Sequence, residues 1–198
     1  MYSRTKRSSS FATNVNELVV ILLLILSTSG CQDRPRLTSA KSRSEIGTEI
    51  TLLTQQQRYE EAVHLGLSGI TGKPEDAVLY RSIAVVYTVR AQSDPQNSER
   101  WLQSAVEFVN KSLKVDTPDP LDKSAGAQAL DTIGDLSKDK GYQLYERAES
   151  LWKEAAAESQ DHPTVTAGSQ AVSTASIRQA AESEVARIAS KRKARNCP

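Results

Sequence analysis

Side chains that catalyse reactions are scarce in this sequence. Its 198 residues include two histidines, His64 and His162, and two cysteines, Cys31 and Cys197. There is no HExxH, GxSxG, Walker A or GxGxxG motif, and two histidines so far apart are more typical of surface or packing positions than of a catalytic pair. We therefore predict that the chain is not an enzyme and takes no cofactor or small-molecule substrate. An enzyme with a divergent site is the alternative.

Groups that bind metal ions are equally few. The sequence has no His/Cys cluster of the kind that holds zinc. Asp116, Asp119 and Asp122 carry the oxygen ligands that calcium prefers, but two prolines stand between them, and the glycine and distal glutamate of an EF-hand loop are missing. We expect these aspartates to lie in a solvated loop, with no metal bound.

Aromatic residues and net charge are also low. Aromatic residues make up 5% of the chain, while Ala, Ser, Glu, Gln, Lys and Arg abound, which favours helices over a sheet-rich core and predicts an all-α fold. The formal net charge is +1, so we expect no nucleic-acid partner. One basic cluster is interpreted as a frayed, solvated helix end: Lys191, Arg192, Lys193 and Arg195.

One long hydrophobic run is present, near the N-terminus. Residues 18–26 read LVVILLLIL, with a basic cluster before them and small residues after them. This is the three-part layout of a secretory signal. As a helix, the run rises about 13.5 Å, well short of the roughly 30 Å hydrocarbon core of a membrane. Residues 1–30 are therefore predicted to be a cleaved export signal rather than a permanent membrane span.

A cysteine follows this run directly. The sequence Thr28-Ser29-Gly30-Cys31 resembles the cleavage site of bacterial lipoprotein signals, although Thr28 stands where an aliphatic residue is usual. The resemblance implies that Cys31 becomes the lipidated N-terminus of an exported protein, anchored to a membrane of the bacterial cell envelope. Several acyl chains make such an anchor durable, at about 0.8 kcal/mol per buried methylene. The alternatives are an uncleaved signal anchor, or a signal cut elsewhere that leaves Cys31 a free thiol.

The segments next to these cysteines lack apolar periodicity. Residues 31–43 are polar and contain Pro35, so we expect a tether between the anchor and the folded domain. With Cys31 lipidated, Cys197 has no partner for an internal disulfide and is predicted to be a free thiol.

Small residues recur at a fixed interval within residues 44–160. Ala62, Ala105 and Ala148 are spaced 43 residues apart, and each begins a row of residues on one helical face. Upstream of the second and third alanines stand the quartets Tyr80-x2-Ile83-Ala84-x2-Tyr87 and Leu130-x2-Ile133-Gly134-x2-Ser137. An internal repeat of this length indicates stacked supersecondary units.

These quartets and alanines resemble the tetratricopeptide repeat (TPR) family, which has W-x2-L-G-x2-Y on a first helix and A-x3-F on a second. The resemblance implies a right-handed α-solenoid of about three antiparallel helix pairs over residues 44–160. The spacing exceeds the usual 34 residues, and the surplus lies mainly in the loops 93–100 and 117–124. Another α-solenoid of the HEAT type, or a plain helical bundle, is the alternative.

Periodicity and loop signals place the individual helices. We predict helices near 44–56, 58–71, 75–91, 98–115, 123–138 and 140–159. Residues 161–198 are expected to form a C-terminal capping helix and a basic tail. The apolar positions of the capping helix recur at helical spacing: Ile177, Ala181, Val185 and Ile188.

The resemblance also implies a function. In TPR proteins the first helix of each pair lines a concave groove that binds a protein or peptide segment. Carried over through the Tyr80 and Leu130 quartets, this groove is expected to contain Arg81, Val85, Thr88, Gln128, Asp131, Asp135 and Lys138. The chain is thus predicted to be a scaffold for protein–protein interaction, and a self-associating structural protein of the envelope is the alternative.

Overall fold

The chain folds into helices joined by short loops, with one small hairpin. The computed structural model describes residues 41–72, 74, 76–115, 118–167 and 170–195. The export signal, Cys31, most of the tether and Cys197 lie outside these residues. In chain order the elements are α2 (Arg43–Gln55), α3 (Tyr59–Gly72), α4 (Ala77–Ser93), α5 (Ser98–Ser112), α6 (Pro120–Leu136), α7 (Gly141–Asp161), β1 (Thr164–Ala167), β2 (Gln170–Ser173) and α8 (Ala175–Arg195).

The prediction of a helical fold is confirmed. Over residues 44–160, every predicted helix boundary lies within three residues of the observed one. Within the part of the chain that the structure describes, none of the helices is both long and apolar enough to cross a membrane.

Polar side chains begin the first helix of each pair. Ser42 accepts a hydrogen bond from the Glu45 amide and forms a capping box at α2. Asp76 accepts from the Leu79 amide at α4, and Asp119 accepts from the Asp122 amide at α6. These carboxylates satisfy amides that have no partner within the helix. Asp119 is therefore a helix cap and not part of an unstructured acidic loop.

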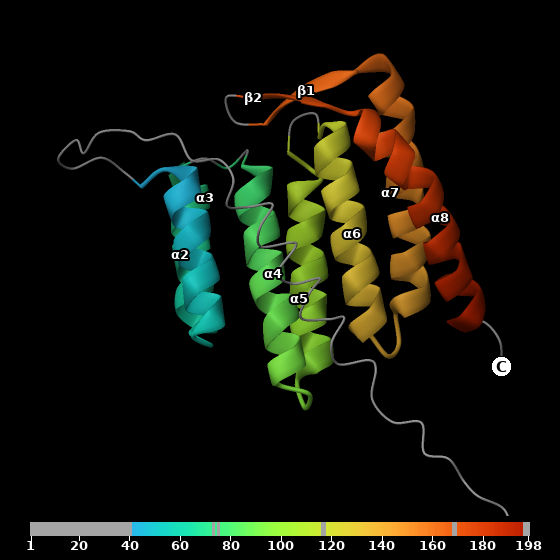
Figure 1. Cartoon of the computed structure of the whole chain (residues 1–198). Coiled ribbons are helices and arrows are strands. Elements are labelled where there is room, and N and C mark those ends of the chain that lie inside the picture. The colour runs from blue at the N-terminus through green and yellow to red at the C-terminus, as the bar shows by residue number, and fades with distance from the viewer. Residues whose placement is uncertain (1–40, 73, 75, 116–117, 168–169, 196–198) are drawn as a thin grey trace, which may run out of the picture.

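The helices pack in the order of the sequence. α2 packs on α3, α4 on α5 and α6 on α7, so each pair forms an antiparallel hairpin, and α8 packs on α7 (Figure 1). α2, α4, α6 and α8 also contact one another in succession. We call these four helices the first-helix row.

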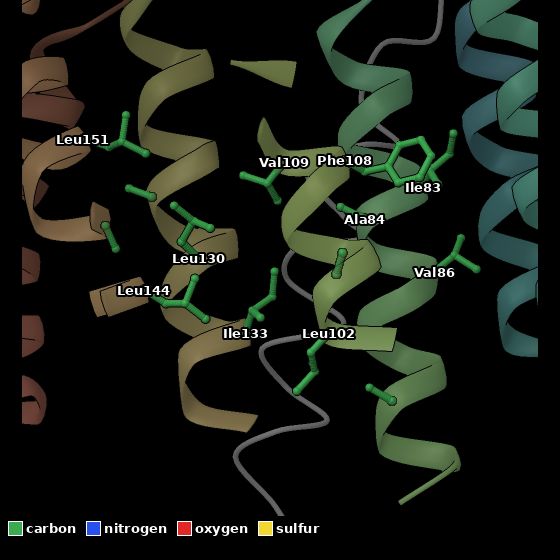
Figure 2. Close-up of a cluster of buried hydrophobic side chains, with 14 of the residues drawn as sticks. Ile83, Ala84, Val86, Leu102, Phe108, Val109, Leu130, Ile133, Leu144 and Leu151 are labelled. Atoms are coloured by element: carbon green, nitrogen blue, oxygen red, sulfur yellow. The ribbon is translucent and has the colours of Figure 1, made fainter. Parts of the chain in front are cut away.

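Small residues allow these helices to approach closely. The three alanines of the repeat, Ala62, Ala105 and Ala148, are all 0% exposed. Larger side chains fill the space around them, and Figure 2 shows Ile83, Val109 and Leu130 among these apolar residues. The repeat alanines are therefore part of the buried core.

The hairpin between α7 and α8 was not predicted. Strands β1 and β2 pair antiparallel, with Thr164 opposite Ser173. The sequence does contain a signal for a hairpin here. Residues 164–172 read TVTAGSQAV, in which β-branched residues stand on both sides of Gly168-Ser169, a pair that favours a two-residue turn. The base of the hairpin is fixed by Thr174, which is 0% exposed and donates its hydroxyl to the His162 carbonyl at 2.8 Å.

Gly66 and Gly47 provide a matched test of the close packing. A Cβ at Gly66 would lie 2.6 Å from Ile83 Cγ1, whereas a Cβ at Gly47 would have no neighbour within 4 Å. We expect Gly66→Ala to lower the free energy of unfolding by about 1–3 kcal/mol through overpacking. Gly47→Ala should raise it by about 0.5–1 kcal/mol, because Ala favours the helix. Urea unfolding followed by circular dichroism measures both. Two stabilised variants would mean that α3 and α4 are not in close contact.

Candidate docking surface

Arg81 connects two helices of the first-helix row instead of facing solvent. Its guanidinium lies 2.6 Å from Asp122 at the start of α6, and the two side chains are only 16% and 20% exposed. Val85 and Thr88 follow on α4 and are half-buried, with the Thr88 hydroxyl donating to the Ala84 carbonyl at 2.9 Å. Of the predicted groove residues on α4, Val85 and Thr88 thus keep a partly open surface.

The predicted groove residues near α6 differ in accessibility. Gln128 and Lys138 are exposed. Asp131 is 5% exposed, because α8 covers it. Its carboxylate pairs with Arg187 at 2.7 Å and with Lys191 at 3.0 Å. The expectation that Asp131 lines an open groove is therefore wrong for the chain in this state.

Asp135 is also engaged from within the chain. Its carboxylate lies 2.6 Å from Lys191 Nζ and accepts a hydrogen bond from Tyr145 Oη at 2.7 Å. Burial and this hydrogen bond raise the pKa of the Tyr145 phenol. Tyr145 therefore remains a hydrogen-bond donor at neutral pH, and it holds Asp135 toward α8.

The predicted groove residues are spread over several levels of α4 and α6. Arg81 is the fifth residue of α4, whereas Asp131 is the twelfth residue of α6. The ion pair from Arg81 to Asp122 shows that the two helices start at the same end. Arg81 and Asp131 therefore lie at different levels of the row. The prediction treated the Tyr80 and Leu130 quartets as equivalent, although Tyr80 is the fourth residue of α4 and Leu130 is the eleventh residue of α6.

The basic C-terminal cluster is docked, which corrects its interpretation as a frayed and solvated end. α8 is helical as far as Arg195. Arg195 donates to the Ser137 carbonyl at 2.5 Å, and Arg192 lies 3.4 Å from Glu149 and 3.9 Å from Glu146. Within the described residues, Lys193 is exposed. We call residues 189–195, which follow the buried Ile188, the basic arm.

Aromatic rings complete the surface beneath the basic arm. Lys191 and Arg195 lie 5.6 Å and 5.5 Å from the Tyr145 ring, and Arg192 lies 5.8 Å from the Tyr142 ring. Cations are attracted to the faces of such rings. We call this region of α6 and α7 the acidic–aromatic surface; it consists of Asp131, Asp135, Tyr142, Tyr145, Glu146 and Glu149.

A residue spacing could have revealed this contact. Arg187, Lys191 and Arg195 are four residues apart, and so are Asp131 and Asp135. Residues four apart share one face of a helix. The sequence therefore contained a basic stripe and a matching acidic stripe.

Elsewhere, charged residues are used in local pairs. His64 is exposed and lines a shallow depression of ≈ 540 Å³ between α2 and α3. The acids around it are paired: Glu61 with Arg58 at 2.6 Å, and Glu60 with Arg90 at 2.6 Å. Among the described residues, no group of three or more His, Cys, Asp or Glu side chains is arranged to hold a metal ion.

A second unpredicted cluster joins three helices. The Arg90 guanidinium on α4 lies 3.7 Å from the Trp101 ring of α5 and 5.8 Å from the Tyr59 ring of α3. Tyr87 stacks on Trp101 with ring centroids 6.2 Å apart. Because Arg90 already fills the space between these rings, the cluster is a structural contact and not an open site.

Comparison with known protein families, with curated proteins and with solved structures finds no match for this chain.

The ion pair between Arg81 and Asp122 should stabilise the row measurably. In a double-mutant cycle with alanine at both positions, we expect a coupling of about 1–2 kcal/mol, because the pair is largely shielded from water. The matched control is the pair Arg58 and Glu61, whose side chains are 51% and 59% exposed. Solvent screening should make that coupling too small to measure. Equal coupling for both pairs in urea unfolding would show that shielding does not strengthen the Arg81 pair.

Proposed function

We propose that the chain is a membrane-anchored scaffold of the bacterial cell envelope, whose TPR-like α-solenoid docks a protein or peptide segment. The observation that carries the proposal is the order of helix contacts. Each first helix packs on its own second helix and on the next first helix. α8 then stands in the position of a fourth first helix. Stacked pairs with contacts only to their neighbours are the defining feature of solenoids.

Contacts within the row support a curved arrangement. Among the described residues, successive members of the first-helix row contact one another, and no comparable contact joins α3 to α5 or α5 to α7. Helices packed more closely on one side place that side on the inside of a curve. The inner side is therefore formed by α2, α4, α6 and α8 (Figure 1).

The accessible part of the inner side lies around the middle of α4 and the middle of α6. Val85 and Thr88 are half-buried there, and Gln128 is exposed. The side chains combine apolar contact with hydrogen-bonding groups, which suits a peptide or a helix laid into a groove. Asp131 is excluded from this accessible part because α8 covers it, and the exposed Asp135 is paired with Lys191.

Lipidation at Cys31 supplies the membrane anchor in this proposal. Ser42 caps α2, so the folded domain begins close behind the tether. The segment 32–41 has ten residues, and fully extended it reaches about 33–36 Å. The docking surface would then be held near the membrane but free to reorient.

One observation favours the alternative of self-association. Among the described residues, the large apolar side chains with the greatest exposure are Leu52 at 51% and Leu67 at 44%. Both belong to the first helix pair, and among the described helices none covers this end of the array. A second copy would bury these side chains.

The lipid anchor is tested by the intact mass of the protein expressed in a bacterium. We expect a species that begins at Cys31 and carries added acyl mass, and we expect Cys31→Ser to lack it. An unmodified parent chain that retains residues 1–30 would instead indicate a signal anchor or a protein that is not exported.

The docking surface is tested by photo-crosslinking in cells that contain the natural partners. A photoreactive residue at Gln128 or Val85 should crosslink a defined partner at least several-fold more than one at Arg147, which is exposed on α7. Equal labelling at all three positions would contradict a groove on the inner side. A product consisting only of this chain would favour self-association.

A further inference from the structure

The basic arm is held in place by charge and not by apolar burial. Ile188 is 0% exposed, and it is the last buried residue of α8 within the described part of the chain. From Ala189 to Arg195 no side chain is buried. The contacts of this segment are the ion pairs, hydrogen bonds and cation–π contacts described above. Contacts of this kind are individually weak at a surface and are screened by salt.

The earlier part of α8 is held differently. Ile177 and Ala181 are buried at 5% and 4% exposure and pack in the main core. α8 therefore covers the end of the array through its apolar residues. This covering role does not require the charges of the basic arm.

The acidic–aromatic surface is suited to a row of cations in general. Asp131 and Asp135 are one helical turn apart and meet Arg187 and Lys191, which have the same spacing. Arg195 reaches the carbonyls of Asp135 and Ser137 at the C-terminal end of α6, where the helix dipole is negative. Any helix with Lys or Arg at i, i+4 and i+8 can make these contacts.

We infer that the basic arm is an intramolecular substitute for a partner, and that the acidic–aromatic surface binds a basic helical segment of another protein when the arm is displaced. This inference rests on the proposed docking function and specifies the chemistry of the partner. The arm is tethered to the surface, so its effective concentration is on the order of millimolar. A partner must compete with the arm for this surface. The chain therefore has a lower affinity for the partner when the arm is docked than when it is released.

The inference is tested by releasing the arm in the full chain. The release variant carries Lys191→Glu and Arg195→Glu. The matched control carries Arg178→Glu and Lys193→Glu, which make the same charge change on the exposed side of α8. The probes are two Ala-rich helical peptides labelled with a fluorophore. One has arginines at i, i+4 and i+8, and the other has the same arginines distributed around the helix.

We expect the release variant to bind the striped peptide at least ten-fold more tightly than the parent and the control do. Adding Asp131→Asn and Asp135→Asn should abolish this binding, and the distributed peptide should bind more weakly. Equal affinity for the parent and the release variant would overturn the inference. So would equal affinity for the two peptides, or no binding by a release variant whose circular dichroism shows native helix content.

Hydrogen exchange provides a second, independent measurement on the unmodified chain. Raising the salt from ~0.05 M to ~0.5 M should accelerate amide exchange in residues 189–195 but leave residues 177–188 protected, because only the arm depends on screened contacts. Unchanged exchange in the arm would overturn the inference. Crosslinking of a partner at Gln128 tests the proposed docking function and does not involve the arm. The inference about the arm can therefore fail while the docking function stands, and the two failures are distinguishable.

Discussion

Close approach between helices at small residues is the constraint on which the rest of the structure depends. Ala62, Ala105 and Ala148 are each 0% exposed, and a side chain at Gly66 would collide with Ile83. Residues this small let helix axes come near the lower end of the usual 8–10 Å separation. These small residues lie on α3, α5 and α7, each of which packs against two successive first helices. Close approach to both neighbours brings those first helices within reach of short-range charge pairs.

An arginine–aspartate ion pair joins each two successive helices of the first-helix row. Arg43 pairs with Asp76 between α2 and α4, Arg81 pairs with Asp122 between α4 and α6, and Arg187 pairs with Asp131 between α6 and α8. The arginine comes from the earlier helix at the first two junctions and from the later helix at the third. An arginine–aspartate pair sets the relative height of two helices more closely than apolar contact does, since its geometry is directional. The reversed third pair lies directly before the basic arm.

The sequence predicted those parts of the fold that depend on neighbours along the chain. Helix positions followed from periodicity and from loops rich in Pro and Asp, and the alanine repeat identified the contact between the helices of a pair. The basic arm was misinterpreted because its partners are 43 to 60 residues away, and local pattern does not show which stripes meet. The hairpin was missed because strands of four residues are marginal alone; here they depend on the buried Thr174. The groove residues were predicted through equivalent quartets, and the helix bounds show that the quartets are not equivalent.

The sequential packing of the helices has a consequence for the order of folding. Most helix contacts join elements adjacent along the chain, which corresponds to a low contact order and to nucleation within individual hairpins. The contacts of the basic arm span 43 to 60 residues and involve α8, which is synthesised after α6 and α7. During synthesis the acidic–aromatic surface is therefore complete before the arm exists. The newly made chain passes through an interval in which its acidic–aromatic surface is uncovered, and the final turns of α8 end that interval.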